Sequence, residues 1–217
     1  MTAPPVAPGP TATAVPSPRS ARWRVGRFQV LASAIVLAAL ATAIALAPSQ
    51  GTVSATQRRA DFTAMVGTLR SDLGGCNAKA SAALSAWQRA SRGQESRVVA
   101  ARLAQLASRA CAPAAGNSVD KLTLYSLPSS LDGLHLDYAV SSLGVWAQED
   151  VSPAMTAEAD LLRRSGDPGG VTTYNRLAGW ADDDGAIANT TLRRAAHRLG
   201  ITGFTGISLT QLTAVSS

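Results

Sequence analysis

Apolar residues recur with helical spacing along most of the chain after residue 60. Over residues 62–87 they lie alternately four and three positions apart, which keeps them on one face of an α-helix. The pattern stops at the polar run 91–94 and resumes over residues 99–110. We therefore expect a helical hairpin whose turn lies near Gly93. The apolar positions are Phe62, Val66, Leu69, Leu73, Cys76, Ala80, Ala83 and Trp87, then Val99, Leu103, Leu106 and Ala110.

A third helix is expected after a short leucine-containing segment that Pro128 ends. Ser129 or Ser130 is the expected N-cap, because a serine hydroxyl can accept a hydrogen bond from the first turn. Pro153 interrupts the apolar pattern, so the helix either kinks there or restarts with Ser152 as its cap. The apolar positions are Leu136, Val140, Leu143, Ala147, Val151, Ala154, Ala157 and Leu161.

A fourth helix is expected from about Thr172 to Leu199, after the Gly- and Pro-containing loop 165–170. Arginines and His197 lie in its last turn, where cations favour the negative helix end, and Gly200 suits the C′ position. Four amphipathic segments joined by short loops predict an all-α fold, an antiparallel four-helix bundle over residues 48–200. Residues 201–217 have no helical pattern and are expected to be an irregular tail.

Residues 28–47 carry no charge and are long enough to cross a bilayer as a helix, since about 20 apolar residues span about 30 Å. Arg19, Arg22, Arg24 and Arg27 precede them, and no Asp or Glu lies upstream. Because basic flanks stay in the cytoplasm, we expect one transmembrane helix with the N-terminus inside and the bundle outside.

The N-terminal 27 residues are rich in Pro and Ala, so we expect a disordered cytoplasmic tail that ends in the basic membrane flank. An alternative is a secreted protein with a cleaved signal peptide, because Ala45-Leu46-Ala47 and Val53-Ser54-Ala55 resemble cleavage sites. Pro48 disfavours the first site, and the apolar run is longer than a signal peptide requires. In both cases the bulk of the chain leaves the cytoplasm.

The chain's two cysteines predict a disulfide. Cys76 lies 17 residues before Gly93 and Cys111 lies 18 residues after it, so the two arms of the hairpin bring them to the same level. Disulfides persist outside the cytoplasm, which agrees with the predicted location. Free thiols and a metal or redox pair are the alternatives, and no C-x-x-C motif supports the second.

Charge argues against a nucleic-acid partner. The formal charge of the whole chain is +6, but four of its 20 Lys and Arg residues precede residue 28 and all 14 acidic residues follow residue 47. This leaves 16 basic and 14 acidic residues, a net charge of +2, for the exported part. So balanced a domain has no electrostatic attraction to nucleic acid.

No catalytic motif is recognisable, and we expect no enzyme, cofactor or metal site. His135 and His197 each lie beside a helix end or carboxylates, where histidines are usually structural. Asp182-Asp183-Asp184 is expected to be a solvated helix face, and would bind calcium only if a loop split the fourth helix. Glu149-Asp150 is likewise expected to face solvent.

The sequence thus favours a membrane-anchored envelope protein with a helical interaction or structural domain. A protein partner in the envelope is expected, and alanines four residues apart in the apolar run are compatible with a homodimer. The alternative is a ligand-sensing bundle that acts through a separate output partner, because few cytoplasmic residues are available to carry a signal.

Overall fold

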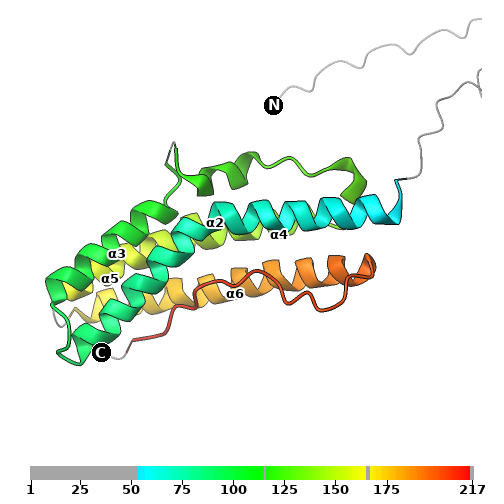
Figure 1. The fold of residues 1–217 in the computed structure, drawn as a ribbon. Coiled ribbons are helices and arrows are strands. Elements are labelled where there is room, and N and C mark those ends of the chain that lie inside the picture. The colour runs from blue at the N-terminus through cyan, green and yellow to red at the C-terminus, as the bar shows by residue number, and fades with distance from the viewer. Residues whose placement is uncertain (1–52, 115, 165–166, 216–217) are drawn as a thin grey trace, which may run out of the picture. The chain divides into compact units, whose positions relative to one another are not determined.

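The computed structural model describes residues 53–217, apart from 115, 165–166 and 216–217. This part of the chain is all-helical and carries one disulfide, as predicted. Helix α2 packs on α3, α3 packs on α5, and α4 and α5 both pack on α6 (Figure 1). The elements are α2 Ala55–Ser91, α3 Arg97–Cys111, η1 Ser118–Leu124, η2 Ser129–Leu131, α4 Leu136–Val145, η3 Trp146–Val151, α5 Ser152–Arg163 and α6 Pro168–Arg198.

The predicted transmembrane helix at residues 28–47 lies outside the described residues, as do Arg19, Arg22, Arg24 and Arg27. Among the residues that the structure does describe, no helix combines the length and apolar character that crossing a bilayer requires.

Helix α2 follows the predicted pattern. The Ser54 hydroxyl caps it by accepting a hydrogen bond from the Gln57 N–H at 3.1 Å, and the predicted apolar face is buried up to Ala83, with Trp87 half-buried. The helix changes direction about halfway along its length (Figure 1), and Gly74 and Gly75 lie at the middle of its residue range. Glycine weakens a helix interior, which accounts for a bend there.

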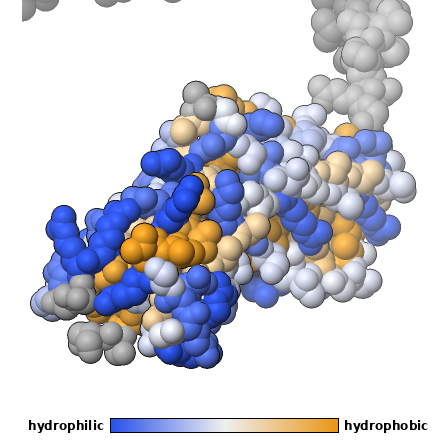
Figure 2. All heavy atoms as spheres, turned by 60° about the vertical axis from the view of Figure 1, so that its left-hand side comes forward, coloured by the Kyte–Doolittle hydropathy of each residue, from blue (hydrophilic) through white to orange (hydrophobic). Residues whose placement is uncertain are grey.

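The buried face of α3 differs from the prediction. Val99 and Leu106 are 45% and 41% exposed, and the buried positions are alanines and Cys111. Small side chains let α3 approach α2 and α5 closely, so packing distance rather than hydrophobicity selects the face. Figure 2 shows hydrophobic residues gathered in separate groups between hydrophilic ones on this face. The buried residues of α3 are Ala100, Ala101, Ala104, Ala107 and Cys111.

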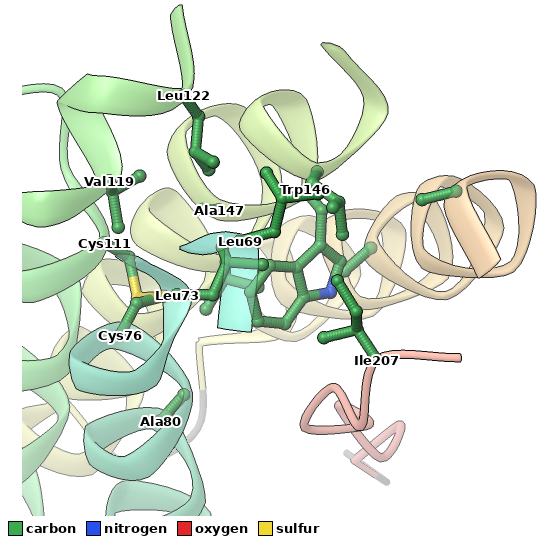
Figure 3. Packing of buried hydrophobic residues seen from close by; sticks show 14 of the residues in the cluster. Leu69, Leu73, Cys76, Ala80, Cys111, Val119, Leu122, Trp146, Ala147 and Ile207 are labelled. Atoms are coloured by element: carbon green, nitrogen blue, oxygen red, sulfur yellow. A yellow bond between two sulfur atoms is a disulfide. The ribbon is translucent and has the colours of Figure 1, made fainter. Parts of the chain in front are cut away.

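The predicted disulfide is present. Cys76 and Cys111 are joined with their Cα atoms 4.7 Å apart, and the pair lies in the core beside Leu73 and Val119 (Figure 3). The bond links α2 to α3 at the end of α3 opposite the Gly93 turn, so it closes the open end of this hairpin.

The third helix begins later than predicted and does not break at Pro153. Ser129 and Ser130 form the short turn η2, and α4 begins at Leu136 after His135, which has a left-handed backbone (φ 55°). Helix α4 continues through the π-helical turn η3 into α5. Ser152 is not a cap, because its hydroxyl donates a hydrogen bond to the Ser108 carbonyl at 3.1 Å.

Helix α6 begins at Pro168, four residues before the predicted start, and ends as predicted. Gly200 follows the end with a φ of +66°, the left-handed conformation typical of a C′ glycine. Residues 201–215, here called the C-terminal segment, form no helix or strand. They run back along the bundle between α2 and α6, since side chains of both helices hydrogen-bond to their backbone (Figure 1).

Candidate functional site

Two carboxylic acids are buried in the third helical stretch, one in η3 and one in α5. Asp150 is 3% exposed and Glu158 is 1% exposed. Within the described residues, neither Glu158 oxygen has a hydrogen-bond partner, and neither does Asp150 Oδ2. Burying an unpaired carboxylate is costly, so these two residues are the first candidates for a role beyond stability.

The π-helical turn places Asp150. In this turn the Ser152 N–H donates to the Ala147 carbonyl five residues earlier, instead of the usual four. Pro153 follows directly, and a proline ring clashes with the carbonyl four residues before it in a regular helix. The wider turn makes room for that ring. Turns of this kind recur at functional sites in helical proteins.

Asp150 faces an acidic side chain of the neighbouring helix. Burial raises the pKa of Asp150 to about 7, and the nearby charge of Asp184 and a hydrogen bond with it contribute in the same direction, followed by the charge of Glu149. Asp184 is half-buried on α6. Asp150 is therefore about half-protonated at neutral pH.

Glu158 lies two turns further along, beside Tyr174 of α6. Burial alone raises the pKa of Glu158 to about 8, so its carboxyl is mostly protonated and uncharged at neutral pH. Burial, and secondarily the charge of Glu158, also raises the pKa of Tyr174. Tyr174 is stacked on Trp87 of α2, with ring centroids 6.2 Å apart. The three side chains thus link α5, α6 and α2.

An open groove of about 550 Å³ lies on the surface next to the same π-helical turn, between α4 and the connection that includes η1. Leu124 and Tyr138 adjoin lining residues in the sequence, and their large side chains are strongly exposed, at 80% and 57%. The groove is lined by Leu122, Thr123, Tyr125, Leu127, Asp137, Val140, Ser141, Gly144, Val145, Gln148 and Glu149.

The residues singled out from sequence do not meet at one site. His135 directly precedes α4, and His197 lies in the last turn of α6. Asp182, Asp183 and Asp184 lie within the uninterrupted helix α6, so the loop that calcium binding required is not there. In the described part of the chain, no three His, Cys, Asp or Glu side chains are grouped so that they could hold a metal ion.

Sequence reasoning missed both buried acids, and the prediction that Asp150 faces solvent is wrong. A signal for Glu158 was available, because it lies four residues after Ala154 and three before Leu161 and so falls on the apolar face. The same signal was available for Asp150, because it lies three residues after Ala147 and four before Ala154 and so falls on the apolar face.

The arrangement can bind and release protons near neutral pH at Asp150 and Glu158, and it offers an open groove to a partner on the adjacent surface. No protein-family model, curated protein or solved structure matches this chain. The functional argument therefore depends on the geometry of the described residues.

Proposed function

We propose that this protein is a single-pass membrane protein of the envelope whose extracytoplasmic antiparallel four-helix bundle binds another envelope protein. It has no enzymatic activity in this proposal, and its N-terminus is cytoplasmic. The observation that carries the binding role is the open groove beside α4, which apolar side chains such as Leu122, Leu127 and Val140 line in part.

The disulfide supports the location outside the cytoplasm. Thiols in the cytoplasm are kept reduced, whereas Cys76 and Cys111 lie at bonding distance in the core of the domain. Together with the uncharged run 28–47 and its arginine flank, this favours an exported domain.

The surface beside the groove supports a protein partner. Leu124 and Tyr138 expose large apolar side chains, and tyrosine is enriched where proteins bind one another. Asp137 and Glu149 in the groove lining add negative charge. A partner segment with apolar and basic side chains would complement this surface.

Site-specific crosslinking in cells tests the proposal. A photo-crosslinking amino acid in place of Ser141, an exposed residue of the groove lining, should capture one specific protein, whereas the same group at Val98 of α3, 78% exposed, should not. Equal capture from both positions, or from neither, would contradict the proposed groove. Alkaline carbonate washing of vesicles tests the anchor, because an integral protein stays with the membrane and a secreted one does not.

A second candidate is a sensing bundle whose ligand is the proton, acting through a separate output partner. Asp150 and Glu158 favour it, because their raised pKa values of about 7 and about 8 lie in a range that an exported domain encounters. Amide hydrogen exchange at pH 6 and pH 9 tests this candidate. A pH-dependent change in α5 and α6 that Glu158→Gln abolishes would support it.

A further inference from the structure

The C-terminal segment is held in the space between α2 and α6 by asparagine side chains. Asn189 of α6 accepts a hydrogen bond from the Ile207 N–H at 2.7 Å and donates one to the Ile207 carbonyl at 3.0 Å. Asn175, four turns earlier on the same helix, makes the same pair of bonds with Val215, each at 2.9 Å.

Helix α2 holds the segment from the other side in a similar way. Asn77 accepts a hydrogen bond from the Thr210 N–H at 2.6 Å and donates one to the Ser208 carbonyl at 3.1 Å. Arg70 donates to the Gly206 carbonyl at 2.9 Å. An amide side chain that bonds both an N–H and a C=O of an extended chain imitates the pairing of a neighbouring β-strand.

The polar contacts go mainly to the backbone, and several apolar side chains of the segment pack against the core, among them Phe204, whose ring lies 5.4 Å from that of Phe62. Ile207 and Leu212 are the buried side chains of the segment, at 5% and 7% exposure. Gly206 is required, because its φ is +110° and a Cβ atom there would lie 2.3 Å from Asn189 Oδ1. The segment carries no charged residue. The space between α2 and α6 therefore accepts an uncharged, extended chain with a glycine, an apolar residue after it, and a second apolar residue five positions later.

The segment can leave without breaking secondary structure. In the described part of the chain, no backbone-to-backbone hydrogen bond joins residues 202–215 to the helices. Open spaces of about 600 Å³ on the α6 side and about 490 Å³ on the α2 side border the segment. Gly200 and Gly203 have φ values of +66° and +75°, so the connection to α6 turns at two glycines.

We propose that the space between α2 and α6 is a binding site for an extended, uncharged segment of a partner protein, which the chain's own C-terminal segment fills in its absence. The backbone contacts fit this role because any extended chain can supply the same N–H and C=O groups to the asparagine side chains. This site lies apart from the groove beside α4 and does not depend on it.

The first test removes the segment and returns it as a peptide. The purified chain, shortened to end after Gly200, should bind a fluorescent peptide of residues 201–217 with saturable anisotropy. Asn189→Ala should weaken binding about tenfold. Thr173→Ala, at an exposed position of the same helix, should not. In the peptide, Gly206→Ala should weaken binding more than tenfold, and Gln211→Ala should have no effect.

A second variant covers the case in which the shortened chain does not fold. A protease site inserted between Gly200 and Gly203 is cut in the folded protein, and the labelled peptide is then added. Exchange of the cut segment for the peptide supports the proposal. A segment that stays bound for days under excess peptide would overturn it, because the segment would then be a fixed part of the core.

The uncut full-length chain tests whether a partner can displace the segment in trans. Excess labelled peptide should bind and should increase hydrogen exchange at residues 206–212 of the chain itself. A scrambled peptide should do neither. Absence of binding at concentrations a thousandfold above the Kd of the shortened chain would overturn the partner role. If mixing differently tagged full-length chains gives a stable dimer, the occupant is a second copy and the proposed foreign partner is wrong.

Discussion

The α2–α3 hairpin and the α5–α6 face belong to the same domain but bury different kinds of groups. The hairpin buries alanines and a disulfide, and the only acid buried along it is Asp72, at 7% exposure. The α5–α6 face, taken here to include the adjoining η3, buries Asp150 of η3 and Glu158 of α5 with unpartnered oxygens. One region therefore has a stability that depends on oxidation, and the other has a stability that depends on pH. Substitutions in the two regions should accordingly respond to different conditions.

Removing the disulfide should have the largest effect. The bond closes a loop with a sequence separation of 35, which in the chain-entropy account stabilises the fold by roughly 4 kcal/mol. The double variant Cys76→Ala with Cys111→Ala should lose about that amount in urea unfolding. A reductant should destabilise the wild type and leave the double variant unchanged. If the wild type and the double variant were equally stable without reductant, the stability of the hairpin would not depend on oxidation.

The α5–α6 face should gain stability in acid. Glu158 has its folded pKa raised from 4.5 to about 8, so its contribution is complete below pH 4.5 and is lost as the pH rises to about 8. Glu158→Gln removes this loss but keeps a buried polar group, so it should be about 2 to 3 kcal/mol more stable than wild type at pH 9. The difference should shrink toward pH 5.

Asp160→Asn is the matched control for that experiment, because Asp160 is exposed on the same helix. Its unfolding free energy should follow the wild-type pH curve. If Glu158→Gln also followed the wild-type curve, the carboxyl of Glu158 would not be the group that makes this face pH-dependent.

Substitutions at a buried and at an exposed position of α3 test which face of this helix is packed. Ala104 is fully buried where α3 approaches its neighbours, so Ala104→Leu should destabilise the domain by about 2 kcal/mol. Leu106→Ser, at a position 41% exposed, should change stability by less than about 0.5 kcal/mol. Thermal unfolding followed by circular dichroism measures both. If Leu106→Ser destabilised the domain more than Ala104→Leu, the buried face of α3 would be the one predicted from the sequence.

The smallest effect is expected at the acid pair. Asp184→Asn removes a neighbouring negative charge, so the pKa of Asp150 should decrease from about 7. Asp183→Asn alters an exposed neighbour and should leave that pKa nearly unchanged. Carbon-detected NMR titration of the carboxyl groups reports the difference. An unchanged Asp150 pKa in Asp184→Asn would show that the two acids do not interact.

Much of the described fold could be predicted because helical spacing reports burial directly when a face carries large apolar residues. The faces of α2 and α6 and the C′ position of Gly200 follow from this rule. Nearly equal distances from the Gly93 turn were enough to pair Cys76 with Cys111.

The remainder depended on contacts that spacing does not carry. Helix α3 buries alanines because closeness to its neighbours outweighs the hydrophobicity of Val99 and Leu106. The asparagines that hold the C-terminal segment are polar residues on helices, and only the tertiary structure reveals that each faces an extended chain.

The bonds between Asn175 and Val215 have a practical consequence for reporter fusions. They hold Val215 near the α2–α3 turn, whereas α2 begins at the other end of the domain (Figure 1). A helix of 37 residues rises about 55 Å. A fluorophore attached after Ser217 and another at Val53 would therefore be well separated, and energy transfer between them would report release of the chain's end.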